Sequence, residues 1–398
     1  MDYCYYGKQQ GPHKRRRGIC MINLLSDDCL FLVFEKLDSK ADRDSFGLTC
    51  HRYLDIQNSS RKCLRTSNKC ISSSMIAKLL DRFTQLQSLT VSTRCPDFSN
   101  SIITKLPIHG SRLHSLDLSN SLNVSRFDLS YCSIINDAVV ASVASSCPSL
   151  STIRLRHSCV TDEGIKYLAT KLGRSLKRVD ILGCSQITDL GISHLNRNCR
   201  QLTVLRITGC SKIVGASILG LPPTLVALHA KECAFDATLV SGALVRSGGC
   251  SLEYLDVSYP WYKHELASLA FGFPATLKVL NLQCCNLVMD ADIINISKGC
   301  PLLQEWNLTG CGRITFLGWK SIASHCQNLE TLHVNYCQGL RDESLLDLGK
   351  GCSRLTLIYL ATRYIGIRGF RSFKKQRPDV KIIQSWPSIP VRTSSRYI

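Results

Sequence analysis

Cysteine is the residue type with the most potential for chemistry in this sequence, because it supplies 22 of the 398 residues. Clustered cysteines can form disulfides or bind zinc, and a single one can act as a nucleophile. No Cys-x-x-Cys spacing occurs, which argues against a zinc site of the RING or ribbon type. The adjacent pair Cys284 and Cys285 invites a catalytic interpretation, but Cys285 lies at a position that recurs along the chain. We therefore expect a structural role for the pair.

The histidines offer no catalytic arrangement either. His51, His157, His229 and His333 each lie within a regular pattern of apolar residues. No candidate nucleophile precedes a helix in the way that covalent catalysis requires. We expect no catalytic site, no metal site and no obligatory cofactor, so any enzymatic activity would come from a partner.

One repeated phrase positions most of these residues. It reads Leu-x-x-Leu-x-Leu-x-x-Cys, then Ile-Thr-Asp-x-Gly-Ile, a helical stretch and a closing Cys, and residues 176–199 hold its clearest copy. A period of about 26 residues with this leucine pattern is typical of leucine-rich repeats. The copies begin at Leu86, Leu113, Leu150, Leu176, Leu202, Leu225, Leu252, Leu277, Leu303, Leu329 and Leu355.

Each copy predicts a short strand, a buried turn and a helix. The leucines of the strand point inward, and the Thr-Asp pair can cap the helix that follows. One repeat cannot bury its apolar face alone, so the copies must stack. The sequence predicts an α/β fold: a right-handed solenoid of about 11 repeats over residues 86–383, with parallel strands on the concave face and helices on the convex face.

The repeat also explains the cysteines, since a free Cys behaves as a small buried hydrophobe. No signal peptide or membrane span is visible, so we expect reduced thiols and a location in the nucleus, the cytoplasm or both. The turn position holds Cys132, Cys184, Cys210, Cys233, Cys285, Cys311 and Cys337. The helix end holds Cys147, Cys199, Cys250, Cys300, Cys326 and Cys352.

The net charge of +19 raises the question of nucleic-acid binding. Residues 1–20 carry five basic residues against one Asp (+4), and residues 361–398 carry nine against one Asp (+8), which leaves +7 of the +19 for the rest. Charge that is concentrated at the two ends argues against a nucleic-acid surface. The run from Lys14 to Arg17 fits either a nuclear import signal or a solvated tail.

Residues 21–65 differ from the repeats. Leu30, Val33, Phe34 and Leu37 form an amphipathic helical stripe, and Ser26 and Ser39 are suited to cap two successive helices. The block resembles an F-box, on these residues: Leu25-Ser26, Leu30, Val33-Phe34, Leu37, Thr49-Cys50-His51 and Tyr53. In the family pattern, Pro stands in place of Ser26 and Trp in place of Tyr53.

Together with cysteine-containing repeats, this block is similar to plant F-box/leucine-rich-repeat proteins over about residues 22–385. The resemblance implies a substrate receptor of a Skp–cullin–F-box (SCF) ubiquitin ligase, in which the F-box binds a Skp-type adaptor and through it a cullin. The alternative is a repeat scaffold or a nucleic-acid-associated protein outside any ligase. The implied adaptor-binding residues are Leu25, Ser26, Leu30, Val33, Phe34, Leu37, Cys50 and Tyr53.

The expected organisation has three further parts: a basic tail (1–20), a linker with a capping helix (66–85) and a frayed C-terminal tail (384–398). Within the second repeat, Asp117-Leu118-Ser119 recurs as Asp128-Leu129-Ser130. Two strand registers therefore compete, one led by Leu113 and one by Val124, and the surplus near 119–129 is either a loop, a recent insertion or a coding artefact.

The concave face is the expected substrate-binding surface, with an unknown protein as the substrate. Adjacent cations there repel one another unless an anion lies between them, so the face is either solvated or docks an acidic peptide, a phosphorylated segment or an inositol phosphate. The aromatic loop at Trp261 either packs on the solenoid or contacts a partner. The candidate basic residues are Arg154, Arg156, Arg178, Arg206, His229 and Lys231.

Overall fold

The computed structural model describes residues 21–66, 73–91, 110–118, 135–235, 251–260, 273–361, 364–384 and Tyr397. The chain divides into two compact units. Among the described residues, the first unit comprises 21–61 and 82–85, and the second comprises the remainder.

The first unit is helical. A 3-10 helix, η1 (Met21–Leu24), is followed by α1 (Asp27–Glu35), α2 (Lys40–Thr49) and α3 (His51–Ser59). Both predicted caps are confirmed: Ser26 Oγ accepts from Cys29 N at 3.3 Å, and Ser39 Oγ accepts from Asp42 N at 3.0 Å. These side chains satisfy amide groups that a helix start would otherwise leave unpaired.

Leu30, Phe34, Tyr53 and Ile56 form the core of this unit. The Tyr53 ring stacks on Phe46, with 4.5 Å between ring centroids. Leu30 and Phe34 belong to the stripe that implied adaptor binding, yet both are buried against α3.

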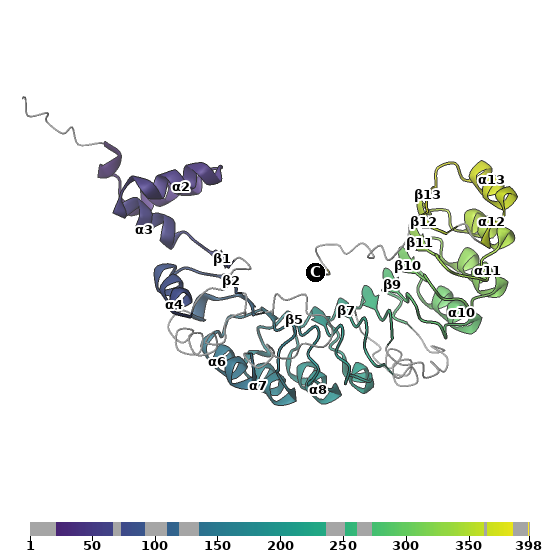
Figure 1. Ribbon diagram of the computed structural model, residues 1–398, viewed down its shortest axis with the longest axis horizontal. Coiled ribbons are helices and arrows are strands. Elements are labelled where there is room, and N and C mark those ends of the chain that lie inside the picture. Colours follow the sequence, from purple (N-terminus) through teal and green to yellow (C-terminus); the bar gives the residue numbers. More distant parts are fainter. Residues whose placement is uncertain are drawn as a thin grey trace, which may run out of the picture. The chain divides into compact units, whose positions relative to one another are not determined.

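The second unit contains one sheet of 13 parallel strands in sequence order, and each strand pairs in register with the next. Figure 1 shows its strands on the inner side of a curve and its helices on the outer side. The strands are β1 (Cys63–Arg65), β2 (Ser88–Thr90), β3 (Ser115–Asp117), β4 (Thr152–Arg154), β5 (Arg178–Asp180), β6 (Val204–Arg206), β7 (Ala227–His229), β8 (Tyr254–Asp256), β9 (Val279–Asn281), β10 (Glu305–Asn307), β11 (Thr331–His333), β12 (Leu357–Tyr359) and β13 (Lys381–Ile383).

The leucine-rich-repeat solenoid is thus confirmed, and the sheet begins one strand before the first predicted copy, at β1. In the anomalous repeat, β3 uses the register led by Leu113; residues 119–129 lie outside the described ranges. The sheet ends at β13, which pairs with β12.

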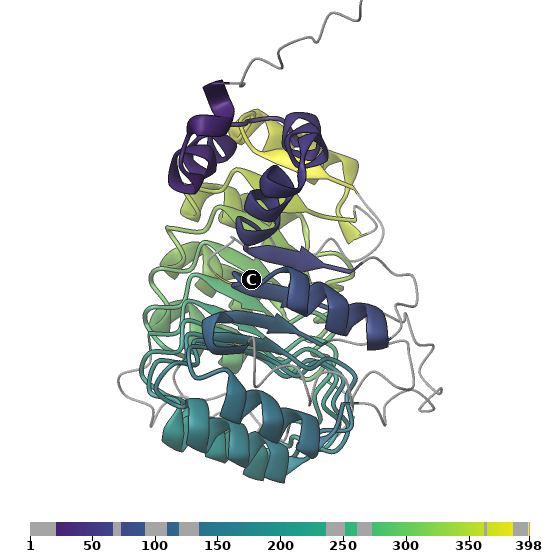
Figure 2. The same ribbon diagram turned by 90° about the vertical axis from the view of Figure 1, so that its left-hand side faces the viewer.

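Helices lie on the convex side of the sheet (Figure 2); those within residues 137–198 pack against one another in sequence order, as do those within residues 290–376. The helices after α3 are α4 (Ser73–Arg82), η2 (Gly110–Arg112), α6 (Asp137–Ser146), α7 (Asp162–Leu172), α8 (Asp189–Asn198), η3 (Ala216–Gly220), α10 (Asp290–Gly299), α11 (Phe316–His325), α12 (Asp342–Gly351) and α13 (Ile367–Gln376).

The turn cysteines within the described ranges are buried, and their thiols are hydrogen bonded. The Cys184 thiol donates to Leu155 O at 3.1 Å, and the Cys311 thiol donates to Leu282 O at 3.2 Å. The residue before the turn cysteine has a left-handed backbone, which Gly183 adopts without strain and Cys284 adopts with φ 60°. Cys284 therefore stands at a turn position that glycine fills in three other repeats, which fits the structural role predicted for the pair.

An Asp at the first residue of several of these helices binds the start of the next repeat. Asp162 Oδ1 accepts from Thr188 N at 2.8 Å, and Asp162 Oδ2 accepts from Thr188 Oγ1 at 2.7 Å. Asp137 makes the same two contacts with Thr161. Asp290 does so with Thr315, and Asp342 accepts from Gly366 N at 2.7 Å. This aspartate ladder connects consecutive helix starts.

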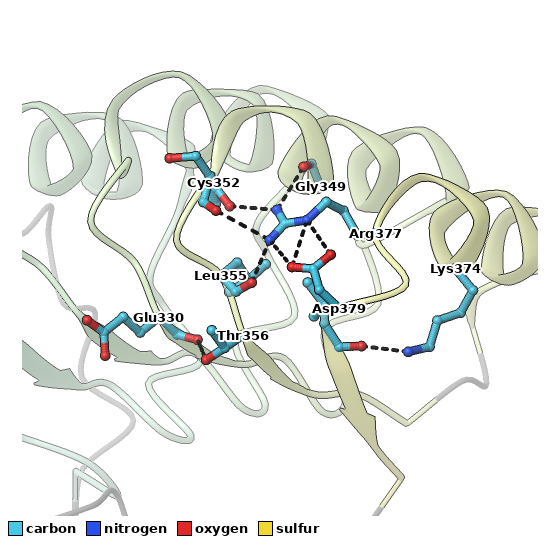
Figure 3. Close-up of polar contacts among 10 residues, drawn as sticks. Glu330, Gly349, Cys352, Leu355, Thr356, Lys374, Arg377 and Asp379 are labelled. Carbon is cyan, nitrogen blue, oxygen red and sulfur yellow. Dashed lines mark hydrogen bonds and ion pairs between the residues drawn. The ribbon is translucent and has the colours of Figure 1, made fainter.

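Arg377 closes the last repeats of the solenoid (Figure 3). Its guanidinium donates to four backbone carbonyls, of which Leu355 O is the nearest at 2.7 Å, and it forms an ion pair with Asp379 at 2.8 Å. The other three carbonyls belong to Gly349, Cys352 and Ser353. A fixed fork of donors suits this task, because the carbonyls of Gly349 and Cys352 at the end of α12 have no partner within the helix.

Candidate interaction surfaces

The predicted adaptor-binding residues separate into a buried and an exposed group. Leu30, Phe34 and Tyr53 are buried in the core of the first unit, and Leu37 packs partly against them. The other four residues of the set are exposed: Leu25, Ser26, Val33 and Cys50.

Two exposed leucines extend the second group, and the sequence interpretation missed them. The Leu48 side chain on α2 is 85% exposed, and Leu32 on α1 is 62% exposed. An amphipathic stripe identifies the residues that face the core. Leu32 and Leu48 lie outside it, and apolar residues in such positions are the sequence signal for an exposed interaction surface. Large exposed apolar side chains on so small a unit are typical of an interaction surface.

The concave face of the second unit is built from the first and third residues of each strand. The middle residues, such as Val179 and Leu205, point into the core and are buried. The predicted basic residues Arg154, Arg178, Arg206 and His229 occupy first or third positions, so they lie on the same face. Neighbouring strands are about 5 Å apart, which brings these side chains close together.

Acidic side chains lie among these cations. Arg156 Nη2 is 2.6 Å from Asp180 Oδ2, and Arg206 Nη1 is 3.9 Å from the same oxygen. Arg154 Nη1 lies 3.9 Å from Asp117 Oδ2. The solenoid thus supplies anions between its own cations. Repulsion among these cations therefore gives no reason to expect an anionic ligand. A role for the basic residues in substrate binding stays a prediction.

The remaining basic candidate, Lys231, follows β7. Its ammonium group is 3.5 Å from Glu232 Oε1 and lies over the Tyr259 ring, 4.9 Å from the centroid. Trp261, the candidate in the aromatic loop, lies outside the described residues.

A small hollow opens on the concave face over β4–β6. Its volume of about 10 Å³ is enough for about one water molecule. Pockets that enclose small molecules measure about 300–1,000 Å³. An inositol phosphate would therefore lie over this hollow rather than inside it. The lining residues on the open side are Thr152, Arg154, Arg178, Asp180, Val204 and Arg206.

Farther along the sheet, polar side chains on the concave face hydrogen bond to the turns that follow the strands. Asn281 Oδ1 accepts from Gln283 N at 3.1 Å, and Asn307 Oδ1 accepts from Thr309 N at 3.0 Å. His333 Nε2 lies 2.9 Å from Glu305 Oε1. These contacts give the polar residues a structural role at the strand ends.

An apolar strip interrupts the polar surface, and the sequence interpretation did not predict it. Its members are the first residues of four adjacent strands, and all are buried although they lie on the concave side: Val204, Ala227, Tyr254 and Val279. The alternation of side chains along a strand predicts that these four residues point to the concave side. The repeated leucine pattern gives no reason for them to be apolar.

Several known proteins resemble this chain. A leucine-rich-repeat family model matches residues 146–169 and 325–349. F-box/LRR-repeat protein 12 of Arabidopsis thaliana is 38% identical over 299 residues, which covers 71% of this chain and 72% of that protein. The chain belongs to the F-box/leucine-rich-repeat family.

Two more distant proteins also resemble this chain. Coronatine-insensitive protein homolog 2 of rice is 25% identical over 86% of the F-box/leucine-rich-repeat chain, which spans 64% of that protein's length. The structure of yeast Rad7 in complex with Elc1 has a TM-score of 0.53 at 17% identity, covering 89% of this chain and 87% of that one, and so shares the fold. No helix among the described ranges is long and apolar enough to span a bilayer.

Proposed function

We propose that this F-box/leucine-rich-repeat chain is the substrate receptor of an SCF-type ubiquitin ligase. Its first unit would bind a Skp-type adaptor and through it a cullin, and its concave face would hold the protein to be modified. The observation that carries the proposal is the exposed apolar surface of the first unit, formed by Leu24, Leu25, Leu32, Val33 and Leu48.

The mechanism would be proximity. The chain holds the substrate in a fixed place, and the ligase partners bring a charged ubiquitin-conjugating enzyme near the lysines of the substrate. Holding two reactants together raises their effective concentration and requires no catalytic group from the receptor. The ubiquitin chemistry belongs to the partners.

Charged substitutions on the exposed surface test the proposal. We expect Leu32→Asp with Leu48→Asp to abolish co-purification of the adaptor and cullin, because anchors buried at an interface each contribute about 2 kcal/mol or more. That is a loss of at least ~30-fold per anchor. Both side chains are exposed, so the unit should remain folded.

The matched control is Leu317→Asp on α11, where the leucine is 61% exposed but belongs to the solenoid. This control should capture the adaptor as the wild type does. Adaptor capture by the double variant at the wild-type level would contradict the receptor role and favour a scaffold that works outside a ligase. Circular dichroism of each variant checks that the helices are retained.

A further inference from the structure

Tyr397, near the C-terminus, lies on the apolar strip of the concave face. It forms one cluster with Val204, Ala227, Tyr254 and Val279 and is 7% exposed. Its ring centroid lies 5.3 Å from that of Tyr254, at an interplanar angle of 33°. Residues 384–398 were expected to be a frayed tail, and Tyr397 departs from that expectation.

The polar groups of Tyr397 are bound as well as its ring. Its carbonyl oxygen lies 2.8 Å from His229 Nε2 and accepts from Arg206 Nη2 at 3.3 Å. Its hydroxyl donates to Glu253 Oε2 at 3.0 Å. Tyr397 thus makes an aromatic contact with β8 and polar contacts with β6, β7 and Glu253, the residue before β8.

The surroundings of these contacts define what the site accepts. Burial, and then the positive charge of Arg206, lower the pKa of His229 to about 4, so the imidazole is neutral and Nε2–H can donate to a carbonyl. Glu253 Oε1 lies 3.4 Å from Lys278 Nζ. The carboxylate at the end of the site accepts a tyrosine hydroxyl, whereas it would repel a phosphate group.

We propose that this site binds an unphosphorylated tyrosine of the substrate protein, and that Tyr397 occupies it as an internal competitor until a substrate displaces it. The inference rests on the receptor role proposed above. The contacts of Tyr397 indicate which groups a substrate must present. They are an aromatic ring on the strip, a backbone carbonyl at His229 and Arg206, and a hydroxyl at Glu253.

A labelled peptide with the sequence of residues 391–398 tests the site in the full-length chain. We expect fluorescence anisotropy to show saturable binding to the Tyr397→Ala variant. Binding to wild-type chain should be at least about tenfold weaker, because a tethered group competes at an effective concentration of about millimolar. Tyr397→Phe keeps the ring but loses the hydroxyl contact, so its affinity for the peptide should be intermediate.

Altered peptides test the chemistry of recognition. Phe in place of the tyrosine should weaken binding to the Tyr397→Ala variant about tenfold, the usual effect of losing a hydrogen bond to a charged group. A phosphotyrosine peptide should not bind measurably. Adding Glu253→Gln should restore part of the phosphotyrosine binding, whereas Glu330→Gln, which lies elsewhere on the unit, should not.

Two outcomes would overturn the proposal. One is equal affinity, or no affinity, of wild type, Tyr397→Phe and Tyr397→Ala for the peptide; the tail would then be only a structural contact. The other is equal binding of the tyrosine and phosphotyrosine peptides. If Tyr397→Ala fails to fold, the comparison of Tyr397→Phe with wild type decides. No adaptor takes part, so this result is independent of the co-purification test.

Discussion

The carboxylate of Asp162 occupies the space that a β-carbon on Gly191 would need. Asp162 Oδ1 lies 2.5 Å from that position and accepts a hydrogen bond from Gly191 N at 3.0 Å. Gly164 and Gly318 stand in the same relation to Asp137 and Asp290. The Gly in the repeated Thr-Asp-x-Gly pattern is therefore required by the aspartate of the preceding repeat.

This relation predicts that Gly191→Ala destabilises the solenoid. The new methyl group must displace the Asp162 carboxylate, which weakens its hydrogen bonds to the start of α8. We expect a loss of about 1–3 kcal/mol in the free energy of unfolding, measured with urea. Gly312→Ala is the control, because a β-carbon there meets no atom within 4 Å. Equal stability of the two variants would contradict the steric argument.

A second prediction concerns Arg377 at the end of the solenoid. Arg377→Lys keeps the charge but cannot reach four carbonyls at once, since an ammonium group lacks the planar fork. We expect a stability loss of about 1–3 kcal/mol, because carbonyls of Cys352 and Leu355 lose their donor. Arg371→Lys on the exposed side of α13 should change stability by less than about 0.5 kcal/mol. Thermal unfolding of both variants makes the comparison.

Thiol reactivity provides a third test. Burial raises the pKa of Cys147, Cys199 and Cys300 to about 12, so at pH 8 almost none of each is thiolate. Cys29 and Cys50 are exposed. We expect iodoacetamide at pH 8 to label Cys29 and Cys50 in minutes and Cys147, Cys199 and Cys300 only after denaturation. Rapid labelling of Cys199 in the native chain would contradict its burial.

The fourth prediction concerns pH and His229. The folded pKa of about 4 lies below the ordinary value of 6.5, so the unfolded chain binds the proton more readily. The stability contributed by neutral His229 is therefore complete above pH 6.5 and declines as the pH falls from 6.5 to 4. The decline should reach about 3 kcal/mol at most.

Carboxylates titrate in the same pH range, so the His229 contribution must be measured as a difference between variants. His229→Gln keeps a hydrogen-bond donor and does not titrate. Its stability should fall less steeply than that of wild type between pH 6.5 and 4. Parallel stability curves would show that His229 is not the group responsible.

The period of the sequence was sufficient to predict the strands, the buried turn cysteines and the capping residues. These three features depend on local geometry that recurs about every 26 residues. The assignment of strand, turn and cap in one repeat therefore predicts them in the other repeats. The stripe on α1 likewise identified Leu30 and Phe34 correctly as one helix face. It could not tell a face that binds a partner from one that α3 covers, because that depends on how three helices pack.

Other parts of the candidate sites depend on side-chain conformation or on distant segments. Pattern alone placed Arg156 and Arg206 on one face, but the approach of both to Asp180 depends on rotamers that spacing does not determine. Tyr397 lies 168 residues from His229 in the sequence, and no periodicity relates the two. Contacts of this kind become visible only in the folded chain.

The aspartate ladder has a direction. Asp137, Asp162 and Asp290 each accept hydrogen bonds from the repeat that follows them in the sequence. During synthesis the N-terminal part of a chain leaves the ribosome first. Each newly made repeat therefore meets a neighbour that already presents the carboxylate its helix start requires. The order of translation is also the order in which this solenoid can be assembled, one repeat at a time.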